Sequence, residues 1–79
     1  MQVRVRLYAN LVRYYPGIKA GQPFEVELAP GSTLADLVTY LRLPPDQVKV
    51  MFINGIARDA NTQIQPGDEI GIFSPIGGG

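Results

Sequence analysis

The chain contains no cysteine and no histidine among its 79 residues. This absence excludes disulfide bonds and metal sites built from Cys and His ligands. It also removes the side chains that most often act as nucleophile or general base in enzymes. Ser32, Ser74 and the threonines have no evident base partner, so an independent enzyme is not the interpretation that we favour.

Charge and hydrophobicity argue against nucleic acid and membrane as partners. Seven basic and seven acidic residues cancel, and no basic run is present, so nucleic-acid binding is not expected. No apolar stretch approaches the roughly 20 residues needed to span a bilayer, and we expect no membrane partner. The first residues enter an alternating pattern without the layout of a signal peptide, which favours a cytoplasmic protein. The length predicts one domain at most.

Apolar and polar residues alternate over residues 2–8 and 24–28, which predicts two half-buried strands. Residues 9–15 between them fit a short helical turn that ends at Pro16-Gly17. Antiparallel pairing of the strands would bring opposite charges together and help to fix the register; a charged docking surface is the alternative. The charged residues concerned are Arg4 and Arg6 on one strand, and Glu25 and Glu27 on the other.

A helix is predicted after the turn at Pro30-Gly31. Ser32 or Thr33 can cap it, and Asp36 follows Thr33 at the spacing of a capping box. Pro44-Pro45 ends it. Its apolar residues recur at the spacing of one helix face: Leu34, Leu37, Val38 and Leu41.

Three further strands are predicted in the last part of the chain. Residues 48–53 are apolar on both faces, as is typical of a central strand. Asn54-Gly55 predicts a type I′ hairpin turn into a short strand at 56–58. Pro66-Gly67 suits a type II turn before a last strand at 69–73, which we expect beside the first strand at the centre of the sheet.

The chain ends in three glycines. A segment without side chains can pass through a slot too narrow for a Cβ and present its terminal carboxylate to the active site of another protein. A frayed terminus and an expression scar are the alternatives, and composition alone does not choose among the three.

Several motifs, in this order and spacing, resemble the ThiS/MoaD family of ubiquitin-like sulfur carriers across essentially the whole chain. The segments that carry the resemblance are Val3–Leu11, Pro30–Leu37, Val50–Gly55, Gln65–Ile70 and Phe73–Gly79. The resemblance implies an α+β, ubiquitin-like β-grasp fold, with a mixed four- to five-stranded sheet and one main helix packed across it. Residues 1–74 would form this domain and residues 75–79 a flexible tail.

The resemblance also implies a mechanism. An adenylating enzyme of the ubiquitin-activating type, similar to MoeB and ThiF, would use ATP and Mg²⁺ to adenylate the carboxylate of Gly79. Sulfur from a persulfide would then convert the adenylate to a thiocarboxylate. Gly77 and Gly78, which carry no side chains, would be the part of the tail that precedes it. The carrier would bind no cofactor or metal and contain no catalytic residue. Its sulfur would go to a partner enzyme, and Phe73-Ser74-Pro75 favours the large subunit of molybdopterin synthase.

Two departures from the family pattern bear on the tail. Ser74 stands where proline is common, and we expect it to loosen the start of the tail. A third glycine lengthens the reach, and we take Gly79 as the reacting end, with trimming to Gly78 as the alternative.

Partner docking is predicted on an apolar patch, because one helix cannot cover both faces of a sheet. The residues proposed for it are Met51, Ile53, Phe73 and Ile76; the alternative for Met51 and Ile53 is an ordinary place in the core. Three other functions stay open: a protein modifier joined to lysines, a ThiS-type carrier for thiazole synthesis, and an interaction domain with an inert tail.

Overall fold

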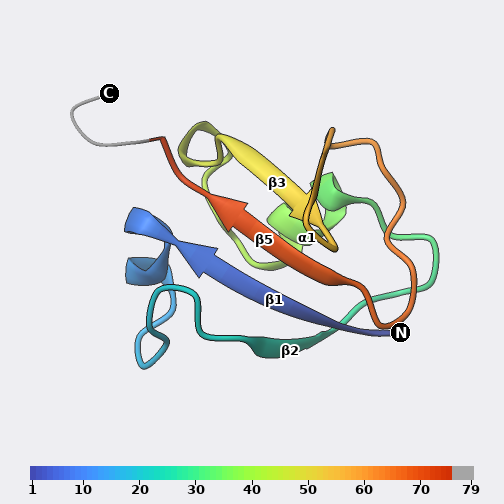
Figure 1. Cartoon of the computed structure of the whole chain (residues 1–79), viewed down its shortest axis with the longest axis horizontal. Helices are drawn as coiled ribbons and strands as arrows, with labels where there is room; N and C mark the ends of the chain where they lie inside the picture. The colour runs from blue at the N-terminus through green and yellow to red at the C-terminus, as the bar shows by residue number, and fades with distance from the viewer. Residues whose placement is uncertain (76–79) are drawn as a thin grey trace.

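The computed structural model describes residues 1–75. Its elements are β1 (Gln2–Tyr8), η1 (Ala9–Tyr14), β2 (Phe24–Glu27), α1 (Leu34–Tyr40), η2 (Pro45–Gln47), β3 (Val50–Ile53), β4 (Ile56–Arg58) and β5 (Glu69–Phe73). The strands form one mixed sheet in the order β2-β1-β5-β3-β4. Figure 1 shows α1 behind this sheet, which confirms the expected architecture of a mixed sheet with one main helix.

The first and last strands lie side by side at the centre, as predicted. β1 and β5 run parallel, with Val5 opposite Ile70 and Leu7 opposite Ile72. These four side chains are at most 1% exposed. Because β2 and the β3–β4 hairpin flank this pair, the central two strands set the position of the others.

The predicted charge pairing between the first two strands forms only in part. Arg4 lies opposite Glu25, and Arg4 Nε is 3.2 Å from Glu25 Oε2. Glu27 lies opposite Gln2, so it cannot meet Arg6. Arg6 instead approaches Glu69 on β5, at 3.7 Å between Nη2 and Oε1.

The helix begins with the predicted capping box. The backbone N–H of Asp36 donates to Thr33 Oγ1 at 3.2 Å, and the backbone N–H of Thr33 donates to Asp36 Oδ2 at 2.9 Å. These two bonds satisfy donors that a helix N-terminus leaves free. The helix ends at Tyr40, before the predicted stop at Pro44-Pro45.

The hairpin turn between β3 and β4 has the predicted geometry. Asn54 has φ of 50° and Gly55 has φ of 85°, which is the pair of positive angles that a type I′ turn needs. The Asn54 side chain also accepts from the backbone N–H of Glu69 at 3.0 Å. The turn is thereby fastened to the start of β5.

The hydrophobic core lies between the sheet and the helix. Its side chains come from α1, from the loops and from every second residue of β1, β3 and β5, together with Val26 of β2 and Leu11 of η1. The intervening residues of β1, β3 and β5 point to the opposite face, which no helix among the described residues covers (Figure 1). None of the helices within residues 1–75 is long and apolar enough to cross a membrane.

Candidate docking surface at the root of the tail

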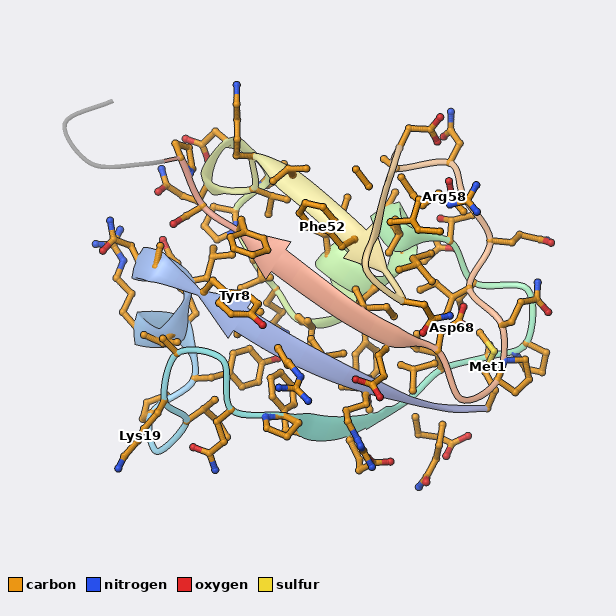
Figure 2. All side chains as sticks on the ribbon, viewed as in Figure 1. Met1, Tyr8, Lys19, Phe52, Arg58 and Asp68 are labelled. Atoms are coloured by element: carbon orange, nitrogen blue, oxygen red, sulfur yellow. The ribbon has the colours of Figure 1, made fainter. Side chains whose placement is uncertain are left out.

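Three aromatic side chains form a cluster on the uncovered face of the sheet. Tyr8 and Phe73 stack with ring centroids 4.2 Å apart and an interplanar angle of 4°, and Phe52 meets Phe73 edge-on at 5.4 Å. Figure 2 shows Tyr8 and Phe52 in front of the ribbon, on the side opposite α1. These three residues, called the aromatic cluster below, come from the ends of β1 and β5 and from the middle of β3.

Two glycines make room for the Tyr8 ring. A Cβ on Gly71 would lie 3.4 Å from Tyr8 Cε2, and a Cβ on Gly21 would lie 3.3 Å from Tyr8 Cε1. The ring therefore lies close to backbone on two sides, and Gly71 leaves space beside it. A hollow of about 310 Å³ opens here, lined by Arg6, Tyr8, Phe52, Gly55, Glu69, Ile70, Gly71 and Phe73.

Charged side chains border this hollow. Glu69 lies within 4.0 Å of Arg4 Nη1 and 3.7 Å of Arg6 Nη2, and Arg4 also pairs with Glu25. The side chains are each at least 38% exposed, so every pair contributes less than about 1 kcal/mol to stability. An apolar centre with a polar border is the layout of a typical protein–protein interface.

The prediction that Met51 and Ile53 are exposed docking residues is wrong. Both are 8% exposed and belong to the core on the helix side. The uncovered side of β3 carries Val50 and Phe52 instead, because neighbouring residues of a strand point to opposite faces. Phe73 does lie on the uncovered face, whereas Ile76, Gly77, Gly78 and Gly79 fall outside the described residues.

The start of the tail is held more firmly than predicted. Ser74 is 3% exposed, and its Oγ accepts a hydrogen bond from the backbone N–H of Asn10 at 3.1 Å. The Phe73 carbonyl accepts from the backbone N–H of Lys49 at 2.7 Å. The expectation that Ser74 loosens this segment is therefore wrong, since its hydroxyl joins the end of β5 to η1.

Tyr15 lies outside this surface and supports the packing of η1. Its hydroxyl donates to the Leu41 carbonyl at 3.1 Å, and its ring stacks with Phe24. Burial raises the pKa of the Tyr15 hydroxyl. The group is therefore a structural hydrogen-bond donor that stays protonated at neutral pH.

Comparison with known proteins identifies the family. A family model described as ThiS matches residues 5–79. The chain belongs to the ThiS family. The match includes the helix, the three C-terminal glycines and all of the sheet except the first three residues of β1. No curated protein matches the chain in sequence.

Solved structures confirm the ubiquitin-like β-grasp fold of this ThiS-family chain. SAMP1 from Haloferax volcanii superposes with a TM-score of 0.72 at 20% identity, covering 100% of both chains. A Pyrococcus furiosus protein described as subunit 1 of a molybdopterin converting factor gives 0.73 at 20%, covering 96% of this chain and 99% of its own. A complex of subunits 1 and 2 of that factor from Helicobacter pylori gives 0.63 at 21%, covering 100% of both.

Tyr8 and Phe52 are surface residues that the sequence interpretation missed. The alternation in β1 assigns Tyr8 to the face of Arg4 and Arg6, which was the available signal. No such signal existed for Phe52, because both faces of β3 are apolar. Met51 is buried and Phe52 is not because α1 packs on the Met51 side of β3.

The neighbours Met51 and Phe52 provide a direct test of this assignment. Met51→Ala should lower the free energy of unfolding by about 2–5 kcal/mol, because it opens a cavity in the core. Phe52→Ala should lower it by only about 1 kcal/mol, mainly through the lost edge contact with Phe73. Urea denaturation of both variants measures the difference, and a larger loss for Phe52→Ala would contradict the assignment.

Proposed function

We propose that this ThiS-family chain is a sulfur carrier whose C-terminal carboxylate, on Gly79, is converted to a thiocarboxylate. The observation that carries the proposal is the family match, which runs through the β-grasp domain and includes the glycine tail. The chain itself acts as a co-substrate without a catalytic residue or a bound cofactor. ATP and Mg²⁺ enter through a MoeB/ThiF-like adenylating enzyme.

The geometry of the described residues supports this role. The aromatic cluster includes Phe73 at the end of β5, and Ser74 and Pro75 follow directly. Five residues, from 75 to 79, can span at most about 16–18 Å. A partner that docks on the aromatic cluster would thus have the terminal carboxylate within reach of a nearby active site.

The chemistry needs no side chain from this protein. A carboxylate oxygen attacks the α-phosphorus of ATP and releases pyrophosphate, which gives an acyl-adenylate. The terminal sulfur of a persulfide then attacks the acyl carbon and AMP leaves. A thiol of the sulfur donor cleaves the resulting sulfur–sulfur bond, leaving the thiocarboxylate on Gly79 and a disulfide on the donor.

Mass spectrometry tests the carrier function. The protein incubated with an adenylating enzyme from the same organism, ATP, Mg²⁺ and a sulfur donor should gain about 16 Da, because sulfur replaces one oxygen. Deleting Gly79 should abolish the gain, since Gly78 would then end one residue short of the reacting position. A gain that persists in the deleted protein would show that Gly79 is not the site.

The large subunit of molybdopterin synthase is the sulfur acceptor that we propose. Phe73-Ser74-Pro75 resembles the corresponding segment of MoaD-type carriers. The Helicobacter pylori structure pairs subunits 1 and 2 of the molybdopterin-converting factor, which supports a complex of this kind. A ThiS-type role in thiazole synthesis is the alternative within the family.

The docking surface can be tested separately from the tail. Phe52→Ala should raise the Kd for the adenylating enzyme at least about tenfold, because large buried aromatics dominate interface energetics. Ile56→Ala is the matched control, since Ile56 is 58% exposed but pairs with Ile53 and so belongs to the other face. Its Kd should stay within about twofold, as measured by calorimetry. Equal affinities for Phe52→Ala and the unmodified protein would remove the aromatic cluster from the interface.

A second candidate function is a protein modifier, which the likeness to SAMP1, the small archaeal modifier protein 1 of Haloferax volcanii, supports. A lysine amine would attack the activated Gly79 carbonyl and release the leaving group, which gives an isopeptide bond. No Lys or Arg follows Arg58, so trypsin should leave residues 59–79 as a branch on the modified lysine. Proteomics of the source organism should detect this branch, and its absence under all growth conditions would count against conjugation.

A further inference from the structure

We propose that Ser74 is a positioning residue that fixes where the reactive tail begins, an inference that rests on the sulfur-carrier function above. Ser74 is the one buried polar residue among those that the structure describes. Its Oγ accepts the backbone N–H of Asn10 at 3.1 Å. This bond joins the residue after β5 to the second residue of η1.

The backbone next to this bond adopts an unusual conformation. Ala9 has φ of 56°, a left-handed angle that is unfavourable for residues with a Cβ. The residue before it, Tyr8, lies opposite Phe73 in the β1–β5 ladder, and the residue after it, Asn10, is bonded to Ser74. The chain thus turns sharply at Ala9, and the residues on either side of it, Tyr8 and Asn10, both contact the end of β5 or the residue after it.

Three contacts of different kinds converge on residues 73 and 74. Phe73 stacks on Tyr8 at 4.2 Å, its carbonyl accepts from Lys49 at 2.7 Å, and Ser74 accepts from Asn10. Of the two residues held by these contacts, Ser74 is the one nearer the C-terminus. Its hydroxyl therefore determines that the segment to be ordered in the partner's active site starts at Pro75 and not one residue earlier.

The hydrogen bond of Ser74 should favour the adenylation step and leave docking on the adenylating enzyme unaffected. Each further backbone residue that must be ordered costs entropy equivalent to about a five- to thirtyfold change in rate. No residue of the aromatic cluster takes part in the Ser74–Asn10 hydrogen bond, so docking on that cluster should not depend on the bond. Loss of the Ser74 hydroxyl should accordingly lower the kcat of adenylation and leave KM nearly unchanged.

The test compares Ser74→Ala with a matched serine variant in the adenylation assay. Ser74→Ala should lower kcat about five- to thirtyfold with KM within twofold, and Ser74→Thr should restore kcat because it keeps the hydroxyl. Ser32→Ala is the control: it removes a serine hydrogen bond to the Ala29 carbonyl at 2.7 Å, in the turn before α1, which Figure 1 places far from the end of β5. Its kcat should be unchanged.

Hydrogen exchange of the Asn10 amide, followed by NMR in the free protein, gives a readout that needs no partner. This amide should be protected in the unmodified protein and in Ser74→Thr, and should lose protection in Ser74→Ala. Thermal unfolding of each variant confirms that it folds.

Unchanged kcat for a folded Ser74→Ala would overturn the proposal, as would equal losses of kcat in Ser74→Ala and Ser32→Ala. If the unmodified protein is not adenylated while the Asn10 amide responds as described, the carrier function fails and the anchoring contact stands.

Discussion

The parallel pairing of β1 and β5 is the interaction on which the rest of this structure depends. It joins segments near the two ends of the chain, and parallel strands require a crossover connection, so every other element is accommodated between them. The helix-side residues of both strands are almost fully buried. The same pairing brings Phe73 onto Tyr8 and thereby places the end of β5 against the start of η1. The root of the glycine tail is fixed by this central ladder.

A second constraint is that a single helix covers only one face of the sheet. The other face must either be polar or find a partner. Here it is divided: β1, β2 and the start of β5 carry exposed ion pairs, whereas the ends of β1 and β5 and the middle of β3 carry the aromatic cluster. The apolar part lies next to the residue from which the tail departs. In the carrier function that we propose, docking and delivery of the carboxylate would be performed by adjacent parts of a very small protein.

Ser74 illustrates how one side chain changes the properties of a terminus. A proline at this position would restrict φ through its ring, and a serine lacks that restriction. In the folded chain the serine hydroxyl is buried and bonded to a backbone donor that the turn at Ala9 directs toward it. Local stiffness is thus replaced by a tertiary contact, which exists only when β1 and β5 are paired.

The sequence by itself determined the elements whose signals are local. The alternation in β1 and β2, the Thr33–Asp36 capping box and the Asn54-Gly55 turn were all predictable, because each depends on residues close together in the chain. The family motifs likewise indicated the fold and the carrier hypothesis. Only the tertiary structure decided which face of β3 is covered, since Met51 and Phe52 are both apolar and the packing of α1 alone distinguishes them. It also decided the hydrogen bond of Ser74, because the Asn10 amide that donates to its hydroxyl lies far away in the chain and no local pattern specifies that contact.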